Sequence, residues 1–243
     1  MNQFSGQVVV ITGAAQGQGL LEARLLVERG ARVLMGDVQE DAGQHAAAAL
    51  GEAARFIKMD VTREDDWRHA LEIASAMGEV HGLVNNAGIY APAPIAATSV
   101  ADFERHFQVN QLGPFLGMKV FVPALRARRN GSIVNIGSAA GMRGSPQSFA
   151  YCATKWALRG MTKALAADAG VDNVRVNYIA PGPVDTPMIH FRGEAENERR
   201  ARQVPLGRLA QAEDVAPMVL FLLSEAGKYI TGAEIMIDGG LYL

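Results

Sequence analysis

Three side chains in the second half of the sequence have the types and spacing needed to move a proton. Tyr151 and Lys155 are four residues apart in a helical pattern, so they share one face of a helix. Ser138 ends a short apolar run that we expect to be a neighbouring strand. Because a phenol with a pKa of about 10 exchanges its proton poorly at neutral pH, we expect the Lys155 ammonium, together with the positive charge of a bound ligand, to lower that pKa. The three groups together would polarise a bound oxygen and exchange a proton with it.

A glycine-rich run near the N-terminus joins the first expected strand to the first expected helix. It contains Gly13, Gln16, Gly17, Gln18 and Gly19. At such a junction, backbone N–H groups and the helix dipole can bind a pyrophosphate. Turns also collect glycine, so the position after a strand carries more weight than the glycines alone. The run therefore predicts a dinucleotide-binding loop.

Asp37 indicates which dinucleotide this loop would bind. It ends the second expected strand about 20 residues beyond the glycine run, where a carboxylate can accept hydrogen bonds from both hydroxyls of an adenosine ribose. Such a carboxylate repels a 2′-phosphate, and no Arg or Lys follows at Val38 or Gln39. The sequence predicts NAD rather than NADP, with helix capping as the alternative role of Asp37.

The elements that must position these groups alternate between short apolar runs and longer helical patterns. The runs are continuously apolar, which indicates strands buried on both faces of a parallel sheet. No linker divides the chain, so we expect one doubly wound α/β domain over residues 1–243, with the polar segment at about 187–207 as a mobile cover. We expect strands at Val8–Thr12, Ala31–Asp37, Arg55–Asp60, Gly82–Asn85, Ser132–Gly137, Val174–Ile179 and Glu234–Asp238, helices at Gly17–Arg29, Glu64–Met77, Val100–Arg128, Ser148–Asp168 and Ala212–Leu223, and irregular chain from Pro181 to Gly207.

Composition excludes several other classes of protein. The chain has 243 residues, of which 49% are hydrophobic, and its formal net charge of -2 gives no general attraction to nucleic acid or anionic membrane. Cys152 is the only cysteine, and the histidines lack metal-ligand spacing, so we expect no disulfide and no metal site. No apolar stretch approaches the roughly 20 residues that span a bilayer, and Met1–Gly6 lacks the pattern of an export signal. We therefore expect a cytoplasmic protein.

These motifs in this order resemble the short-chain dehydrogenase/reductase family almost from end to end. The Asn-Asn-Ala-Gly turn after the fourth strand adds Asn86, Ala87 and Gly88 to the glycine run and to Tyr151-x-x-x-Lys155. The resemblance implies a Rossmann fold with a seven-stranded parallel sheet, and hydride transfer between NAD(H) and an alcohol or ketone. The coenzyme-binding residues that we expect are Gly13, Gln16, Gly17, Gln18, Gly19, Asp37, Asp60, Val61, Asn86, Ala87, Gly88, Tyr151, Lys155, Pro181, Gly182, Val184 and Thr186.

The resemblance also implies roles that the residues alone do not reveal. Asn110 would join Ser138, Tyr151 and Lys155 as the fourth catalytic residue, holding a helix distortion and a water that links Lys155 to solvent. Thr186 would hold the nicotinamide carboxamide. Two positions depart from the family pattern, because Gln18 stands where an apolar residue is usual and Gly137 stands where a second serine is frequent.

The residues expected beside the catalytic set are mostly apolar or small, which favours a hydrophobic secondary alcohol or ketone, for example a cyclic, terpenoid or steroidal one. Arg143 is the exception, and it would either hold a carboxylate or lie exposed at the rim. In members of the family, the C-terminal region and the long central helices pack into homotetramers, and we expect the same here. The residues that we expect to line the substrate pocket are Tyr90, Ala140, Arg143, Gln147, Met188 and Phe191.

Two alternatives remain open from the sequence. One is an NADP-linked 3-ketoacyl-type reductase, which tighter binding of NADP than of NAD would favour. The other is a nucleotide-sensing homologue that has the fold and lacks the chemistry. Such homologues typically lack the tyrosine or the lysine, and this chain has both Tyr151 and Lys155.

Overall fold

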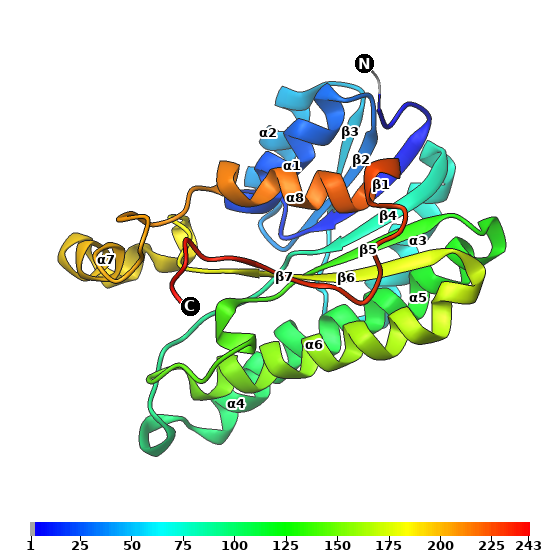
Figure 1. Ribbon diagram of the computed structural model, residues 1–243. Helices are drawn as coiled ribbons and strands as arrows, with labels where there is room; N and C mark the ends of the chain where they lie inside the picture. The colour runs from blue at the N-terminus through cyan, green and yellow to red at the C-terminus, as the bar shows by residue number, and fades with distance from the viewer. Residues whose placement is uncertain (1–2) are drawn as a thin grey trace.

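A computed structural model describes residues 3–243, so the first two residues of the expected domain 1–243 lie outside the described residues. Seven parallel strands form one sheet in the order β3-β2-β1-β4-β5-β6-β7 (Figure 1). This order confirms the doubly wound α/β fold predicted from the sequence. The strands are β1 (Gln7–Thr12), β2 (Arg32–Asp37), β3 (Ala54–Lys58), β4 (Glu79–Asn85), β5 (Gly131–Ile136), β6 (Val174–Pro181) and β7 (Glu234–Ile237).

Helices cover both faces of the sheet because the side chains of each strand point alternately to opposite faces. In β1, Val8 and Val10 pack toward α3 and α5, whereas Val9 and Ile11 pack toward α1 and α8, and all four are 0% exposed. Figure 1 shows α1 and α8 above the sheet and α5 and α6 below it. The helices are α1 (Gly17–Glu28), α2 (Glu40–Leu50), α3 (Glu64–Met77), α4 (Val100–Phe107), α5 (Gly113–Arg128), α6 (Phe149–Ala169), α7 (Glu194–Ala201) and α8 (Ala212–Leu223), with short 3₁₀ turns at Ile95–Ala97, Ala139–Gly141, Gly170–Asp172, Pro187–Arg192 and Glu225–Gly227.

The single helix expected over Val100–Arg128 is interrupted. A π-helical turn, η2 (Gln108–Leu112), lies between α4 and α5. Its wider winding turns Asn110 inward, where the side chain is 0% exposed and exchanges two hydrogen bonds with the backbone of Ile89, at 2.8 and 2.9 Å. These two bonds offset the cost of the irregular turn, which apolar periodicity does not reveal.

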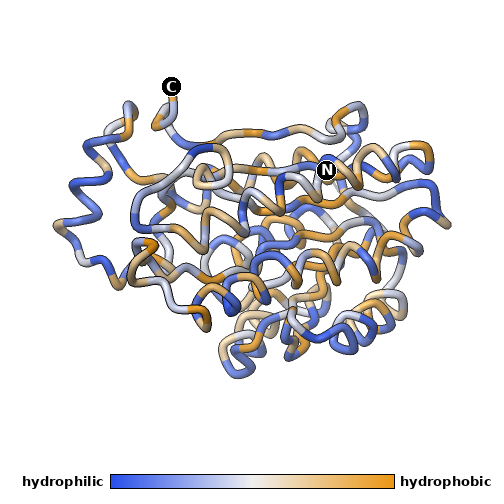
Figure 2. The backbone as a smooth tube through the Cα atoms, turned by 90° about the horizontal axis from the view of Figure 1, so that it is seen from below, coloured by the Kyte–Doolittle hydropathy of each residue, from blue (hydrophilic) through white to orange (hydrophobic). Residues whose placement is uncertain are grey.

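The expectation of irregular chain from Pro181 to Gly207 is wrong for part of this segment, because it contains α7. Glu196 explains the helix, since its carboxylate accepts hydrogen bonds from Arg199 at 2.7 Å and from Arg200 at 2.8 Å, three and four residues further on. Figure 1 shows α7 at one edge of the molecule, and the same edge of Figure 2 is largely hydrophilic. Within residues 3–243, no helix combines the length and the apolar character that crossing a bilayer requires.

Tyr178 of β6 joins the end of β5 to α6. Its side chain is 0% exposed, and its hydroxyl accepts a hydrogen bond from the Ser138 amide at 3.0 Å. The same hydroxyl lies 3.2 Å from the Ser138 carbonyl oxygen and 3.3 Å from that of Lys155, so its single proton is shared between two acceptors. A Cβ atom on Gly137 would overlap the tyrosine ring. The glycine at this position therefore makes room for the side chain that fixes the Ser138 backbone against α6.

Replacing Tyr178 by phenylalanine should lower the free energy of unfolding by about 1–3 kcal/mol, because the Ser138 amide loses its acceptor in the protein interior. Urea denaturation measures this change. Tyr229→Phe is the matched control, since Tyr229 is fully exposed and the same hydroxyl is removed there without loss of a contact. Equal stabilities of the two variants would show that the Tyr178 hydroxyl does not hold this junction together.

Candidate active site

A cavity of about 630 Å³ opens at the carboxyl ends of the strands. It lies across the point where the order of the sheet reverses between β1 and β4, which is where open α/β sheets bind their ligands. Its walls include Gly13, Asp37, Asp60, Asn86, Ser138 and Gly182, each of which ends or closely follows a different strand. The topology thus brings together site residues that lie far apart in the sequence.

The glycine-rich loop needs glycine for two physical reasons. Gly13 and Gly17 have φ angles of +66° and +58°, in the left-handed region. A Cβ atom on Gly13 would also lie 2.8 Å from the Cα atom of Ala87, on the turn after β4. Gly19 does not line the cavity, and a Cβ atom there would lie 2.5 Å from the carbonyl oxygen of Gly13. Its role is close packing beneath the loop.

The first turn of α1 is suited to an anion. Gln16 is the residue before the helix, its side chain makes no capping hydrogen bond, and the first turn contains no acidic residue. The N–H groups and the positive end of the helix dipole are therefore left without a side-chain partner. Gln16, Gly17 and Gln18 all line the cavity, so these donors lie where a pyrophosphate would bind.

Asp37 ends β2 on the cavity wall. Its two carboxylate oxygens accept hydrogen bonds from the amides of Ala15 at 3.1 Å and Gln39 at 3.0 Å. Helix α2 begins at Glu40 after Gln39, so Asp37 is not its N-cap and that alternative is wrong. Each oxygen retains a lone pair for a further donor. Lys58, opposite Asp37 on β3, forms an ion pair with Glu40 at 3.1 Å.

The remaining expected coenzyme residues come from the ends of β3, β4 and β6. A Cβ atom on Gly182 would lie 2.9 Å from the Cα atom of Asp238, so this turn requires glycine. The Thr186 hydroxyl lies 3.5 Å from the carbonyl oxygen of Val184. The cavity walls include Asp60, Val61, Asn86, Ala87, Gly88, Pro181, Gly182, Val184 and Thr186.

Ser138, Tyr151 and Lys155 meet on one wall of the cavity. Tyr151 and Lys155 both lie on α6, as their spacing predicts. The Lys155 side chain is 4% exposed, donates a hydrogen bond from Nζ to the carbonyl oxygen of Ile136 at 2.8 Å, and lies 5.6 Å from the centre of the Tyr151 ring. The Ser138 hydroxyl accepts a hydrogen bond from the amide of Ala140 at 3.1 Å.

Burial is the largest influence on the pKa values of Tyr151 and Lys155. It raises the pKa of Tyr151 to about 12, although a hydrogen bond with Ser138 and the positive charge of Arg192 act in the opposite direction. It lowers the pKa of Lys155 to about 8, so the ammonium is still the major form at neutral pH. In the protein alone, desolvation of the phenolate outweighs these effects, and the expectation that Lys155 and an oxidised nicotinamide together lower the phenol pKa stays a prediction.

Asn110 lies behind this wall rather than on it. A Cβ atom on Gly88 would lie 3.3 Å from Asn110 Oδ1 and 3.7 Å from Lys155 Nζ. Both side chains therefore approach the same glycine, and Asn110 holds the distorted helix turn η2 against the Ile89 backbone. The catalytic role that the resemblance implies for Asn110 stays a prediction.

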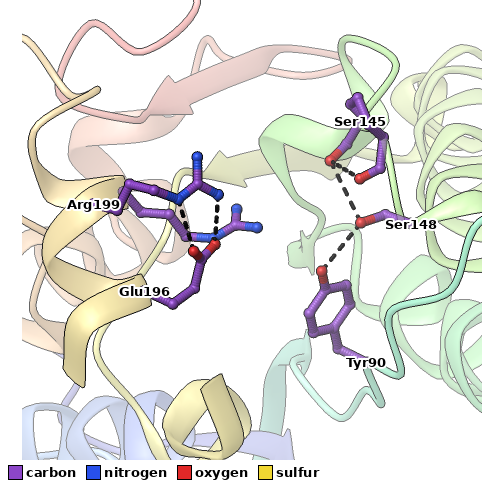
Figure 3. Close-up of polar contacts among 7 residues, drawn as sticks. Tyr90, Ser145, Ser148, Glu196 and Arg199 are labelled. Atoms are coloured by element: carbon purple, nitrogen blue, oxygen red, sulfur yellow. Dashed lines mark hydrogen bonds and ion pairs between the residues drawn. The ribbon is translucent and has the colours of Figure 1, made fainter. Parts of the chain in front are cut away.

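Tyr90, Ala140 and Met188 line the end of the cavity near Tyr151. The Tyr90 ring lies 4.9 Å from the Tyr151 ring, and its hydroxyl is 3.1 Å from that of Ser148. Figure 3 shows that Ser148 also forms a hydrogen bond with Ser145. The Glu196–Arg199 ion pair of α7 lies on the other side of the same view. No sequence motif marked the two serines.

Three residues that we expected to line the substrate pocket do not line the cavity. The guanidinium of Arg143 stacks on the ring of Tyr242 at 5.2 Å. Gln147 is exposed in a turn with a φ of +62°, and Phe191 is 58% exposed. Arg192, from the segment before α7, and Tyr242, from the C-terminal tail, line the cavity instead. The sequence analysis did not predict either residue as part of the pocket.

Gln18 has a partner that explains its departure from the family pattern. Its side-chain amide donates a hydrogen bond to Glu22 Oε1 at 2.9 Å, one turn further along α1. Glu22 is 0% exposed, and burial raises the pKa of its carboxyl from 4.5 to about 8. Within residues 3–243, its Oε2 atom has no hydrogen-bond partner. The folded protein therefore favours the protonated carboxyl.

The free energy of unfolding should fall as the pH rises from about 4.5 to about 8, because in this window folded Glu22 holds a proton that the unfolded chain releases. Glu22→Gln removes the charge and keeps the shape, so its stability relative to the natural chain should rise by about 2–4 kcal/mol across the window. Thermal or urea unfolding at several pH values measures it. Glu28→Gln, at the exposed end of the same helix, should show no such trend. A pH-independent difference for Glu22→Gln would contradict a protonated carboxyl.

Known proteins match this chain over nearly its whole length. The family described as enoyl-(acyl carrier protein) reductase matches residues 13–242. The 3-alpha-(or 20-beta)-hydroxysteroid dehydrogenase of Mycobacterium tuberculosis is 39% identical over 236 residues, covering 97% of this chain and 89% of that protein. The cyclopentanol dehydrogenase of Comamonas testosteroni is 38% identical over 246 residues, covering 99% of this chain and 98% of that protein.

A solved structure of a short chain dehydrogenase/reductase family protein has the same fold, with a TM-score of 0.90, 36% sequence identity and 99% of both chains covered. The resemblance that the motifs carry is therefore confirmed independently by sequence and by structure. This chain belongs to the short-chain dehydrogenase/reductase family of oxidoreductases, whose members use a nicotinamide dinucleotide.

Proposed function

We propose that the chain is an NAD(H)-dependent dehydrogenase that interconverts a hydrophobic cyclic secondary alcohol and its ketone. The observation that carries this proposal is the meeting of Ser138, Tyr151 and Lys155 on one wall of the cavity that the glycine-rich loop and Asp37 also line. The names of the two relatives, which specify a hydroxysteroid and cyclopentanol, support a substrate whose alcohol lies on a ring.

Each residue of the wall has a distinct task in this reaction. In alcohol oxidation, the Ser138 hydroxyl donates a hydrogen bond to the substrate oxygen, and the Tyr151 phenolate accepts the hydroxyl proton as the C–H bond breaks. In ketone reduction the same proton returns from Tyr151 to the oxygen. Lys155 keeps a positive charge beside the phenol, and its two remaining N–H groups would bind a ribose hydroxyl.

The coenzyme site fits NAD, and the chemistry that NAD⁺ supplies when bound is hydride acceptance together with one positive charge. A nearby positive charge favours the phenolate, which the protein's own groups disfavour at a pKa of about 12. Gln16, Gly17 and Gln18 would hold the pyrophosphate on α1, and Asp37 would accept the adenosine ribose hydroxyls. The Val184 backbone and the Thr186 hydroxyl would hold the carboxamide.

Residues 187–207 would cover a substrate bound at Tyr151, so that one domain supplies the coenzyme loop, the proton-transfer groups and the cover. Met188 and Arg192 of this segment line the cavity.

The homotetramer expected from the resemblance also remains a proposal. It is supported by the aromatic side chains exposed on neighbouring helices α4, α5 and α6, which are Phe103, Phe107, Phe115, Phe149 and Trp156.

Tyr151→Phe should lower the rate of alcohol oxidation by about 10²–10⁴-fold, because the ring is kept and the group that accepts the proton is lost. The measurement is NADH absorbance with NAD⁺ and a panel of cyclic secondary alcohols. Tyr229→Phe, which removes an exposed hydroxyl, should retain the natural rate. Equal rates for Tyr151→Phe and the natural chain would remove Tyr151 from the mechanism.

The natural chain should bind NAD⁺ more tightly than NADP⁺, and Asp37→Asn should weaken NAD⁺ binding by about 10- to 100-fold, as expected for lost charge-assisted hydrogen bonds. Calorimetric titration with each coenzyme measures both effects. Asp41→Asn removes a charge from the exposed first turn of α2 and should leave NAD⁺ affinity unchanged. Tighter NADP⁺ binding by the natural chain would refute the role of Asp37 and favour the ketoacyl-type reductase.

A further inference from the structure

Arg192 differs from the other arginines of residues 187–207. Arg199 and Arg200 both lie against Glu196, and Arg202 lies against another glutamate. Within residues 3–243, the guanidinium of Arg192 has neither an ion-pair partner nor a hydrogen-bond acceptor, yet the side chain is half-buried and lines the cavity. Its five N–H donors are therefore free inside the cavity mouth.

Aromatic stacking holds this guanidinium near the proton-transfer wall. Its central carbon lies 4.9 Å from the centre of the Tyr90 ring and 5.8 Å from that of Phe191. The Tyr90 ring in turn lies 4.9 Å from the Tyr151 ring. Stacking uses the face of a guanidinium and leaves its in-plane N–H groups available. The Tyr90 ring thus contacts both the Arg192 guanidinium and the Tyr151 ring.

The charges of the cavity wall leave Arg192 unbalanced. The acidic residues that line the cavity are Asp37 and Asp60, which lie at the ends of β2 and β3 on the coenzyme side. Arg105 and Arg200 also line the cavity, but Arg105 is exposed on α4 and Glu196 binds the Nε atom of Arg200 at 2.8 Å. A half-buried charge without a partner is costly. A ligand that brings a negative charge to this end of the cavity would remove that cost.

We infer that the substrate carries a carboxylate and that Arg192 binds it while the reacting hydroxyl lies at Tyr151. This inference rests on the proposed function, because it assigns the negative charge to the alcohol that the enzyme oxidises. A carboxylate matches the planar guanidinium with two parallel hydrogen bonds. An acidic protein partner fits less well, because the exposed Arg199 of α7 and Arg202, directly after α7, already form ion pairs with glutamates. The substrate class is therefore a hydroxy acid with a ring between its hydroxyl and its carboxylate.

The test compares 4-hydroxycyclohexanecarboxylate with its neutral carboxamide, using NAD⁺ and the full chain. The natural chain should show a kcat/KM about 10- to 100-fold higher for the acid, and Arg192→Gln should bring this ratio close to one. Arg192→Lys should retain part of the preference because it keeps the charge without the two-pronged geometry. Arg202→Gln removes an exposed, paired arginine from the same segment and should keep the full preference. Equal kcat/KM values for acid and carboxamide in the natural chain would overturn the inference.

A binding measurement separates this inference from the proposed reaction. Calorimetry with NAD⁺ present compares cyclohexanecarboxylate with cyclohexanecarboxamide, neither of which has a hydroxyl to oxidise. Tighter binding of the acid by the natural chain, lost in Arg192→Gln, supports the anion site even if no alcohol is oxidised, and in that case the proposed dehydrogenase activity fails. If alcohols are oxidised but the acid has no binding advantage, the activity stands and the carboxylate site is refuted.

Discussion

The burial of Lys155 next to Tyr151 is the constraint that the rest of this site depends on. An ammonium that is 4% exposed loses most of its hydration, and the surrounding backbone compensates for that loss. The carbonyl oxygen of Ile136 accepts one of its protons, and Gly88 leaves the space in which Nζ and Asn110 come together. Tyr178 fixes the backbone on either side, since its hydroxyl contacts both Ser138 and Lys155. The π-helical turn η2 supports this arrangement, because it carries Asn110.

The same burial explains why the two halves of the cavity depend on each other. The protein's own groups hold the Tyr151 phenol at a pKa of about 12, so the wall alone favours the protonated form. The coenzyme half of the cavity provides free N–H groups at α1 and an acceptor at Asp37, which suit a dinucleotide. In our account, proton exchange at Tyr151 is therefore efficient only when the coenzyme half is occupied.

Local signals in the sequence predicted the fold, the glycine-rich loop and the pair Tyr151 and Lys155, because strand apolarity, glycine at a turn and four-residue spacing each depend on nearby residues. Features that depend on contacts across the fold were missed. The hydrogen bonds of Tyr178 need β5, β6 and α6 to be in place, and α7 has no apolar stripe to mark it. The substrate end was predicted least well, since Arg143 stacks on Tyr242 and leaves the cavity to Arg192.

The pKa of the Tyr151 phenol is the most direct test of this account. Ultraviolet difference titration detects phenolate, and the difference between the natural chain and Tyr151→Phe isolates the signal of this one residue. The account predicts a pKa of about 12 for the protein alone and a lower pKa when NAD⁺ is bound, as one added positive charge beside the phenol requires. An unchanged pKa on NAD⁺ binding would contradict the proposal that Tyr151 exchanges the proton with the help of the coenzyme charge.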